Sequence, residues 1–523
     1  MPVQPILIAG DWRSANASGT FKATNPATTQ PLPDEYPIST WADCDAALAA
    51  ASLAAAKLRN TPAESIAKFL EAYAARIEAC SGDIVTMANL ETGLPRSPRL
   101  SDAELPRTTN QLRQAAAAAR EGSWKRATID TKANIRSYLA PLGPVAVFGP
   151  NNFPLAFNSI AGGDFASAIA AGCPVIAKAH SSHPGTTRLL AALALAAMEA
   201  AGLPPSSVQM IYRTSHADGE RLAGDPRLGG IGYTGGRTAG LTLKKAADAV
   251  GKPIYLELSS VNPVVILPGA LRERADKVAE EFTGSCLMGA GQFCTNPGIV
   301  FLIAGSETER FLGLIRDRFA AAPVGTLLAE SVLKSLETSV MTLRKAGAQV
   351  LVGGATGGGA GHSHSNTLLK VSGRQFLEAP EAMQTEAFGN VSLVVVVDDA
   401  EQLAQALDHL EGNLTGCFYT HTGGEDDAVY DRLAPRMRPH VGRLLNDKMP
   451  TGVAVSPAMN HGGPFPATGH PGFTAVGIPA SMTRFGALEC FDNVRPGRLP
   501  VELRDKNPTG KMWRLVDGAW TQS

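Results

Sequence analysis

The sequence predicts an α/β fold with at least two domains, and three observations support this prediction. Between residues 144 and 257, short apolar runs alternate with helix-like segments, as in a parallel sheet covered by helices on both faces. The length of 523 residues suffices for two or three domains with large cores. The composition, with 44% hydrophobic residues, 6% aromatic residues and 53 glycines, is typical of Ala- and Gly-rich α/β proteins.

Charge, hydropathy and cysteine content narrow the class of protein further. Lys and Arg total 47 and Asp and Glu total 48, and a net charge of −1 argues against a nucleic-acid or anionic-membrane partner. The chain does not begin with a basic segment and an apolar run, and Gly, Asp or Pro interrupts its longest apolar stretches. We therefore expect neither a signal peptide nor a membrane span. Seven cysteines without a pairing pattern indicate a reducing compartment, so we expect a cytoplasmic protein.

The first 140 residues are expected to form short strands and then a layer of helices. Residues 6–25 contain strand-like runs, with a hairpin beginning at Gly10–Arg13. Pro141 and Pro144 exclude a long helix after residue 134, so residues 134–139 are interpreted as an extended strand. Such a strand can pair with another subunit, although an ordinary hairpin is the simpler alternative. Ala-rich periodic segments predict helices over Ala42–Arg59, Ala63–Cys80, Gly82–Gly93 and Ala103–Glu121.

The alternating region predicts the strands and helices of one parallel sheet. In such sheets, ligands bind beyond the carboxyl ends of the strands. A Gly-Cys-Pro sequence at residues 172–174 is expected to stop the first helix. The predicted strands cover residues 144–150, 175–178, 208–212, 230–233 and 253–257, and the predicted helices cover Phe157–Ala171, Thr186–Gly202, Ser215–Ala223 and Thr238–Ala249.

A second α/β domain is expected from about Ser259 onward. Its predicted helices are Ala275–Met288, Glu307–Ala321, Ala329–Ala346 and Asp399–Leu410. Its predicted strands are Ile299–Ile303, Val350–Gly353 and Val391–Val397. The tail from residue 490 to residue 523 is rich in Pro and Arg and is then expected to form short strands.

The stretch from Gly289 to Asn296 places Cys294 among small and polar residues. Gly289 and Gly291 let the backbone bend sharply and let a ligand come close. A thiol there can be reached by a substrate, and a thiolate is a strong nucleophile toward carbonyl compounds. The alternative is that Cys294 is a small buried hydrophobic residue, as most free cysteines are.

Four pieces of sequence resemble a known family when they are taken in order. Gly149–Pro154, with the sequence Gly-Pro-Asn-Asn-Phe-Pro, follows a strand, and Tyr233–Gly240 joins a strand to a helix. Leu256–Leu258 then closes a strand, and the Cys294 loop comes last. This series resembles the aldehyde dehydrogenase superfamily over nearly the whole chain. Each piece alone is a weak signal, but the order is highly specific.

The resemblance implies an aldehyde-dehydrogenase-like fold. It has a Rossmann-type cofactor-binding domain at residues 1–123 and 141–258 and an α/β catalytic domain at residues 259–489. A small β element, made of bridging strands and the tail at residues 124–140 and 490–523, serves oligomerisation. The resemblance also implies a homodimer or a homotetramer.

The resemblance further implies oxidation of an aldehyde to a carboxylic acid through a cysteine thioester. Cys294 is the implied nucleophile, and Asn152 and the Cys294 backbone N–H are the implied oxyanion donors. Glu257 is the implied general base that activates the hydrolytic water. From the residues alone, the favoured interpretation of Glu257 is a salt-bridged carboxylate at a strand end, and that of Asn152 is a helix N-cap.

The implied cofactor is a nicotinamide dinucleotide. Gly235 and Gly240 resemble the glycines near the pyrophosphate, where helix N-terminal N–H groups favour negative charge. Gly236 stands where many relatives carry Ser. Glu386 and Phe388 resemble the residues that hold the nicotinamide ribose and pack near the ring. A surface helix cap is the alternative for Glu386.

The segment from Lys178 to Ser181 favours NADP, with NAD as the second choice. Many NAD-preferring relatives carry Glu three residues after this Lys, whereas here Ser181 occupies the place. Ser and Lys can both donate to a 2′-phosphate, and no carboxylate repels it. The pairs His180 with His183 and His362 with His364 lack nearby Cys or carboxylate clusters, so we expect no metal.

Within the superfamily, the closest resemblance is to the NADP-dependent α-ketoglutaric semialdehyde (2,5-dioxopentanoate) dehydrogenases. It rests on residues 162–164, 178–185 and 461–466 and on the ending from Leu499 to Val516. NADP-linked fatty-aldehyde dehydrogenases share much of this pattern and are the alternative, as is a broad-specificity enzyme. A keto-acid substrate needs a basic or amide-rich pocket, and a fatty aldehyde needs an apolar tunnel. A non-catalytic protein on the same fold is the remaining class. The sequence does not place Arg443, His461 or Arg484 in the pocket.

Overall fold

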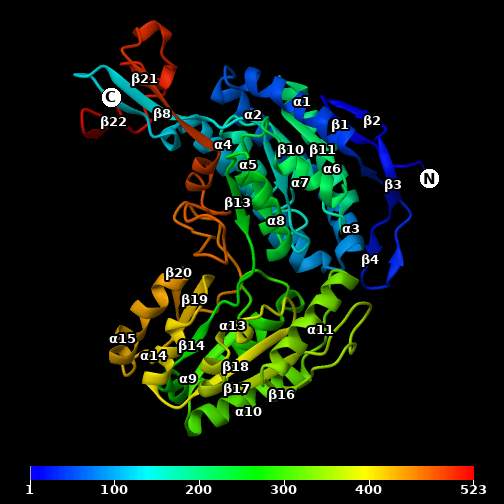
Figure 1. The fold of residues 1–523 in the computed structure, drawn as a ribbon, viewed down its shortest axis with the longest axis vertical. Helices are drawn as coiled ribbons and strands as arrows, with labels where there is room; N and C mark the ends of the chain where they lie inside the picture. Colours follow the sequence, from blue (N-terminus) through cyan, green and yellow to red (C-terminus); the bar gives the residue numbers. More distant parts are fainter. Residues whose placement is uncertain (1) are drawn as a thin grey trace.

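The computed structural model describes residues 2–523 and contains two sheet-centred lobes and a projecting arm (Figure 1). Each lobe is built on a sheet of seven strands, and the arm carries a sheet of five. No helix among the described residues is long and apolar enough to cross a membrane.

The first lobe contains the parallel sheet that the alternating pattern predicts. Its order is β13-β12-β9-β10-β11-β1-β2, in which β9 to β13 are all parallel. The two outer strands, β1 and β2, form the predicted hairpin and run antiparallel to their neighbours. The strands are β1 (Ile6–Ile8), β2 (Asp11–Arg13), β9 (Val145–Phe148), β10 (Val175–Lys178), β11 (Val208–Ile211), β12 (Gly230–Thr234) and β13 (Ile254–Glu257).

Helices surround this sheet close to where periodicity predicts them. Gly93 and Gly202, both with φ of 68°, end two of these helices in the left-handed conformation that glycine favours. Two small antiparallel pairs, β3 (Ala17–Phe21) with β6 (Tyr36–Ser39) and β4 (Thr24–Asn25) with β5 (Gln30–Pro31), precede them. The helices are α1 (Trp41–Leu58), α2 (Ala63–Ala79), α3 (Ser81–Thr92), α4 (Leu105–Glu121), α5 (Gly163–Ala170), α6 (Pro184–Ala201), α7 (His216–Ala223) and α8 (Arg237–Asp248).

The prediction of a helix over Phe157–Ala171 is wrong in its first half, because α5 begins only at Gly163. The preceding residues form tight turns. A Cβ on Gly162 would lie 2.5 Å from the Phe157 Cα, so the chain folds back on itself there. The Asn158 side chain stabilises the turns by donating to the Pro154 carbonyl at 2.8 Å. The segment after β9 is therefore a compact loop, and Asn152 lies in this loop and not on a helix.

The second lobe has its own mostly parallel sheet, in the order β16-β17-β18-β15-β14-β19-β20. Only β16 is antiparallel to its neighbour. The strands are β14 (Val264–Ile266), β15 (Ile299–Ile303), β16 (Gln349–Val352), β17 (Thr367–Ser372), β18 (Val391–Val397), β19 (Asn413–Tyr419) and β20 (Val441–Asn446), and the helices are α9 (Pro268–Leu287), α10 (Ser306–Ala321), α11 (Glu330–Lys345), α12 (Gly373–Glu378), α13 (Pro380–Met383), α14 (Ala400–Asp408) and α15 (Asp427–Met437).

The arm combines two segments that are far apart in the sequence. Its sheet has the order β21-β8-β7-β22-β23, made of β21 (Gly486–Asp492), β8 (Ile135–Pro141), β7 (Thr128–Asp130), β22 (Arg514–Val516) and β23 (Ala519–Thr521). The predicted strand at residues 134–139 is thus β8, which pairs antiparallel with β21 along its whole length. The arm projects away from both lobes at the upper left of Figure 1.

Candidate active site

Cys294, His461 and Glu257 lie in contact at the carboxyl end of β13. The Cys294 Sγ is 3.3 Å from the His461 Nε2, and the same Nε2 is 3.0 Å from the Glu257 Oε1. His461 and Glu257 are almost fully buried. The donor atoms of all three residues lie within 4.8 Å of one another, a spacing that suits a proton relay and also a metal ion. The expectation that no metal is bound stays a prediction.

Backbone pairing puts His461 in this position. Glu257 forms an isolated bridge with Thr468, so the segment that follows β20 runs along the end of β13. The His461 N–H donates to the Thr474 Oγ1 at 3.0 Å, and its carbonyl accepts from the Ala475 N–H at 3.0 Å. Sequence reasoning did not place His461 in the site. The motif at residues 461–466 was its only signal.

The loop before Cys294 is held in an unusual conformation. Gly289, Ala290 and Gly291 have φ of 56°, 55° and 70°, so three consecutive residues are left-handed. A Cβ on Gly291 would lie 2.0 Å from the Gly389 carbonyl oxygen. The prediction that the two glycines bend the backbone sharply is confirmed. The left-handed Ala290 could not be foreseen.

Two buried amides lock this loop in place. The Gln292 Nε2 donates to the Gly289 carbonyl at 3.0 Å, and its Oε1 accepts from the Leu328 N–H at 2.8 Å. The Asn262 Nδ2 donates to the carbonyls of Cys294 and Asn296, each at 2.9 Å. Because both amides are buried and hydrogen-bonded, they hold the backbone on either side of Cys294 in place.

Asn152 approaches the Cys294 loop from the first lobe. Its Nδ2 donates to the Gln292 carbonyl at 3.0 Å, which leaves the second N–H of the amide free to donate elsewhere. Among the described residues, the Cys294 N–H has no hydrogen-bond acceptor. Both groups can therefore donate to an oxygen that forms next to the sulfur.

The environment of Cys294 favours the protonated form of the thiol. Burial raises its pKa well above the usual value, and the charge of Glu257 adds to the rise, while the charge of Arg107 opposes it. A protonated thiol needs a base before it can attack a carbonyl. The nearest base is the His461 imidazole.

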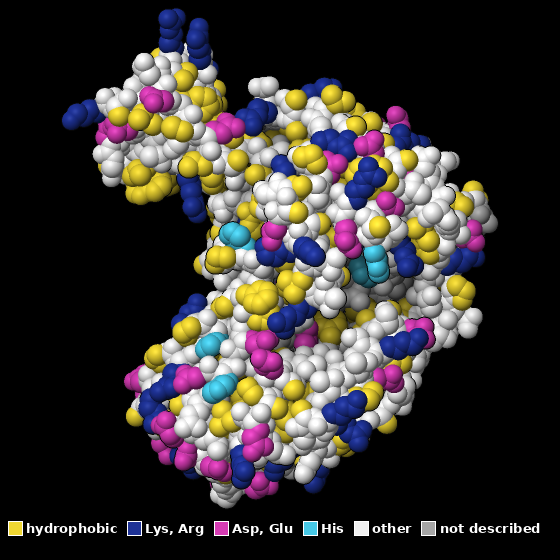
Figure 2. Space-filling model, in the orientation of Figure 1, with side chains coloured by type: hydrophobic (Ala, Val, Ile, Leu, Met, Phe, Trp, Pro, Cys, Tyr) yellow, Lys and Arg dark blue, Asp and Glu magenta, His cyan; other side chains and the backbone are white. Residues whose placement is uncertain are grey.

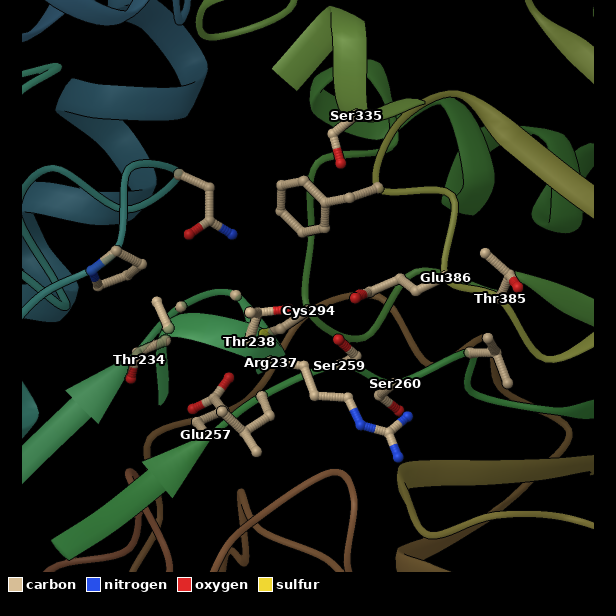
Figure 3. A pocket seen from close by; sticks show the side chains of 18 of the residues that line it. Thr234, Arg237, Thr238, Glu257, Ser259, Ser260, Cys294, Ser335, Thr385 and Glu386 are labelled. Atoms are coloured by element: carbon tan, nitrogen blue, oxygen red, sulfur yellow. The ribbon is translucent and has the colours of Figure 1, made fainter. Parts of the chain in front are cut away.

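A cavity of about 730 Å³ opens beside Cys294 between the lobes. Glu257 and Glu386 lie on either side of Cys294 in Figure 3, and Arg237 and Thr238 contribute from the start of α8. The first residues of α8 have no side-chain cap, so their N–H groups face the cavity. A Cβ on Gly236 would meet nothing within 4 Å, so a ligand has room there. This end of the cavity fits the pyrophosphate of a dinucleotide.

The other predicted cofactor residues are distributed unevenly. Glu386 and Phe388 line this cavity, as do Gly235 and Gly236. Burial raises the pKa of Glu386 to about 7, and hydrogen bonds from Ser259 and Ser260 oppose the rise. Gly240 does not line the cavity. A Cβ there would lie 2.5 Å from the Leu258 Cδ2, so this glycine lets α8 pack against the segment after β13.

Lys178 and Ser181 lie outside the lining of this cavity, at and just beyond the end of β10. Burial, together with the nearby charge of Arg213, lowers the pKa of Lys178 to about 8. Arg213 follows the neighbouring strand β11, so two cations stand beyond adjacent parallel strands. Sequence reasoning missed Arg213, which carries no motif.

A second cavity of about 650 Å³ has Phe153 and Phe293 in its lining. Phe153 directly follows Asn152 and Phe293 directly precedes Cys294 in the chain, although Asn152 and Cys294 themselves line the first cavity. Arg99 and Arg107 also line it. The Arg107 guanidinium lies over two rings, 5.5 Å from the centroid of Phe153 and 5.1 Å from that of Phe157. Sequence reasoning did not identify either arginine.

The chain is similar to characterised proteins over almost its full length. Residues 12–461 match the Aldehyde dehydrogenase family. Alpha-ketoglutaric semialdehyde dehydrogenase 2 of Azospirillum brasilense is 36% identical over 524 residues, which cover 98% of each chain. Alpha-ketoglutaric semialdehyde dehydrogenase of Acinetobacter baylyi is also 36% identical, over 99% of this chain and 98% of its own.

Solved structures share the fold at lower identity. A 3,6-anhydro-L-galactose dehydrogenase in complex with NAP superimposes with a TM-score of 0.82 at 20% identity, covering 94% of this chain and 99% of its own. An aldehyde dehydrogenase of Pseudomonas syringae with NAD⁺ and octanal superimposes with a TM-score of 0.80 at 21% identity. The match covers 95% of this chain and 98% of its own. The predicted α/β, aldehyde-dehydrogenase-like fold is confirmed.

Proposed function

The chain belongs to the aldehyde dehydrogenase family, and from this we propose that it oxidises α-ketoglutaric semialdehyde to 2-oxoglutarate with NADP. Membership makes it an oxidoreductase that takes an aldehyde and a nicotinamide cofactor. The observation that carries the catalytic proposal is the contact of the His461 Nε2 with both the Cys294 Sγ and the Glu257 Oε1. The nucleophile therefore contacts its base, and the base contacts a carboxylate that can stabilise its positive charge.

The first half of the proposed reaction joins Cys294 to the aldehyde. The thiol proton moves to the His461 Nε2, and the sulfur adds to the carbonyl carbon. The Glu257 carboxylate stays ionised and stabilises the imidazolium, which returns the proton to the sulfur when the acid is released. The carbonyl oxygen becomes an alkoxide, which accepts hydrogen bonds from the Asn152 Nδ2 and the Cys294 N–H. Removing one donor of this kind costs roughly 3–4 kcal/mol of transition-state stabilisation in other enzymes.

The second half releases the acid. Glu386 and Phe388 would hold a nicotinamide, which would supply the hydride acceptor, and Cys294 would then hold the oxidised carbon as a thioester. Glu257 then takes a proton from a water molecule, which attacks the thioester and frees the Cys294 sulfur. The Glu257 Oε2 is buried and has no hydrogen-bond partner among the described residues, so it can accept this proton.

The proposed substrate rests on the two relatives that are 36% identical, both named for α-ketoglutaric semialdehyde. A fatty or broad-specificity aldehyde is the second candidate. It is favoured by the aromatic residues Phe153 and Phe293 in the lining of the second cavity. The two arginines of the same cavity favour the semialdehyde, because a carboxylate pairs with a guanidinium.

The proposed preference for NADP rests on charge at the ends of β10 and β11. Lys178 and Arg213 supply two cations, and Ser181 replaces the carboxylate that would repel a 2′-phosphate. We also propose a homodimer or homotetramer assembled through the arm, with the first lobe as the cofactor-binding domain and the second as the catalytic domain.

Rapid mixing of Glu257→Gln with aldehyde and NADP tests the proposal. A burst of reduced cofactor followed by a slow phase is expected, because only hydrolysis of the thioester needs the activated water. Cys294→Ala should form no thioester and show no turnover while it still binds NADP. Steady turnover by Cys294→Ala would contradict the assigned nucleophile. Wild type that oxidises none of a set of short aldehydes with either cofactor would instead indicate a non-catalytic protein.

A further inference from the structure

We propose that the guanidinium of Arg107 binds the carboxylate of the aldehyde substrate in the second cavity. This inference rests on the proposed function and adds the residue that selects the substrate class. Arg107 lies in the first turn of α4 and lines the cavity together with Phe153 and Phe293. Phe293 directly precedes Cys294, and the charge of Arg107 acts on the Cys294 thiol, so an aldehyde in that cavity has Cys294 near one end and a cation in the wall.

Arg107 is a cation without a counter-ion, unlike its neighbour Arg99. Arg99 Nη1 pairs with Glu104 at 2.5 Å, and its Nη2 donates to the Asn152 carbonyl at 3.0 Å. Arg107 makes no ion pair among the described residues, and its one hydrogen bond is a weak contact of 3.5 Å with the Gln111 Oε1. The Arg107 Nη2 is buried without any partner. A desolvated charge of this kind costs free energy unless an anion joins it.

Glu104 cannot act as the missing counter-ion. Its side chain is fully buried, and its Oε1 accepts from the N–H groups of Leu155 and Ala156 at 2.8 and 3.0 Å. Its Oε2 accepts a hydrogen bond from Arg99. Both oxygens of the Glu104 carboxylate are thus occupied, one by the loop that carries Asn152 and one by Arg99, so Arg107 can bind a ligand.

The aromatic rings next to Arg107 orient the N–H donors of its guanidinium. The guanidinium lies over Phe153 and Phe157, and stacking on aromatic faces leaves the N–H groups at its edge free. Phe157 also packs against His461, with ring centroids 5.9 Å apart. The same aromatic group therefore borders the carboxylate site and the reacting atoms, and its apolar faces suit the methylene groups between the two ends of a short semialdehyde.

Arg443 is the other cation near Cys294, and its terminal nitrogens already contact groups of the protein. Its Nη2 donates to the Pro450 carbonyl at 3.1 Å and to the Gly452 carbonyl at 3.4 Å, and its Nη1 contacts the Met459 sulfur. It holds the segment that closes the second cavity. Arg99 and Arg443 each keep only a buried Nε without a partner, whereas the Arg107 Nη atoms make no hydrogen bond among the described residues, and the substrate carboxylate supplies the charge that Arg107 lacks.

The test compares two aldehydes of equal length, 5-oxopentanoate and pentanal, in wild type and in Arg107→Met. We expect wild type to have the higher kcat/KM with 5-oxopentanoate. Arg107→Met should lower that value by about 10- to 100-fold, the loss expected for a hydrogen-bonded charge pair, and leave pentanal almost unchanged. Arg107→Lys should give an intermediate ratio of the two kcat/KM values. Lysine keeps the positive charge but lacks the paired N–H donors with which a guanidinium binds a carboxylate.

Arg113→Met is the matched control. Arg113 is on the same helix, but it is exposed and pairs with Glu78, so neither substrate should be affected. Glutarate should inhibit the oxidation of pentanal in wild type and lose that effect in Arg107→Met. If Arg107→Met does not fold, the ratio of kcat/KM for 5-oxopentanoate to that for pentanal in Arg107→Lys tests the inference.

The possible results distinguish the role of Arg107 from the proposed function itself. An equal loss with both aldehydes would mean that Arg107 only supports the phenylalanine rings, and it would overturn this inference while the proposed chemistry stands. An unchanged substrate ratio in a folded variant would overturn it as well. Wild type without any aldehyde oxidation would overturn the proposed function itself.

Discussion

The Nε2 atom of His461 contacts both Cys294 and Glu257, so its removal should separate activation of the thiol from hydrolysis. In His461→Gln the thiol proton has no base, and burial keeps the pKa of Cys294 high. We expect the first turnover to slow by about 10²–10⁴-fold, the usual contribution of a general base. The remaining rate should rise with pH throughout the range in which the thiol deprotonates.

Single-turnover measurements from about pH 6 to pH 10 check this expectation. His470→Gln is the control, because its ring packs on Tyr255 and lies outside the Cys294 contacts. A variant at position 461 with normal acylation and the wild-type pH profile would show that His461 only packs the site.

Lys178 makes cofactor preference depend on pH. Burial, with a further contribution from Arg213, lowers its pKa to about 8, so the free protein loses this charge as pH rises through that value. A 2′-phosphate needs the charged form. We therefore expect kcat/KM for NADP to fall above about pH 8 while the value for NAD stays nearly level.

Two variants separate charge from structure. Lys178→Arg should abolish the pH dependence, because a guanidinium stays charged. Ser181→Glu should lower kcat/KM for NADP by roughly tenfold or more and favour NAD, through repulsion of the phosphate. The proposed preference fails if wild type favours NAD or if Ser181→Glu leaves the cofactor ratio unchanged.

At this scale, the sequence predicts the residues that stand in short motifs next to strand ends. Glu257 ends a buried strand, Asn152 follows another, and Cys294 follows a glycine-rich turn. His461 lies 167 residues beyond Cys294, in a segment without periodicity that only tertiary contacts bring back to β13. The counter-ion deficit of Arg107 is likewise invisible, because it depends on where Glu104 points.

The loop that presents Cys294 depends on backbone conformation more than on side chains. Gly291→Ala places a Cβ 2.0 Å from the Gly389 carbonyl oxygen at φ of 70°, so the loop must move. We expect a loss of roughly 2–4 kcal/mol in the free energy of unfolding, together with a large loss of activity. Thermal unfolding and steady-state rates measure both.

Gly284→Ala is the control for this substitution. Gly284 lies inside α9, and a Cβ there meets nothing within 4 Å, so alanine should raise the free energy of unfolding by about 0.5–1 kcal/mol. If Gly291→Ala is as stable and active as Gly284→Ala, the loop does not constrain the sulfur in the way described.

Most elements of the first lobe could be predicted from the sequence, whereas several in the second lobe, among them β14, β19 and α15, were not predicted. Most predicted helices and strands are within a few residues of their observed bounds. The strand β19 was missed because buried polar residues interrupt its apolar pattern. One of these, Asn413, accepts from the N–H groups of Val261 and Asn262 at 2.9 and 3.0 Å. Hydropathy does not register polar groups that tertiary hydrogen bonds satisfy.

For the molecule as a whole, the arm is the part whose sheet edges and apolar side chains are left exposed in a single chain. Its strand β21 is an edge of the five-stranded sheet, and Leu488 on that strand is 73% exposed. Trp520 on the opposite edge strand, β23, is 59% exposed. Figure 2 shows hydrophobic side chains gathered on the projecting arm. Open strand edges and apolar patches of this kind favour pairing with another chain.

Leu488→Lys should therefore weaken assembly. In a twofold dimer each copy buries its own Leu488, at about 1.5–3 kcal/mol for each side chain, so the dissociation constant should rise by about 10²-fold or more. Sedimentation velocity over a concentration series measures the shift. Leu53→Lys on α1 is the matched control, since Leu53 is a leucine with 68% exposure outside the arm, and it should leave assembly unchanged. A wild-type chain that stays monomeric at high concentration, or equal behaviour of the two variants, would contradict assembly through the arm.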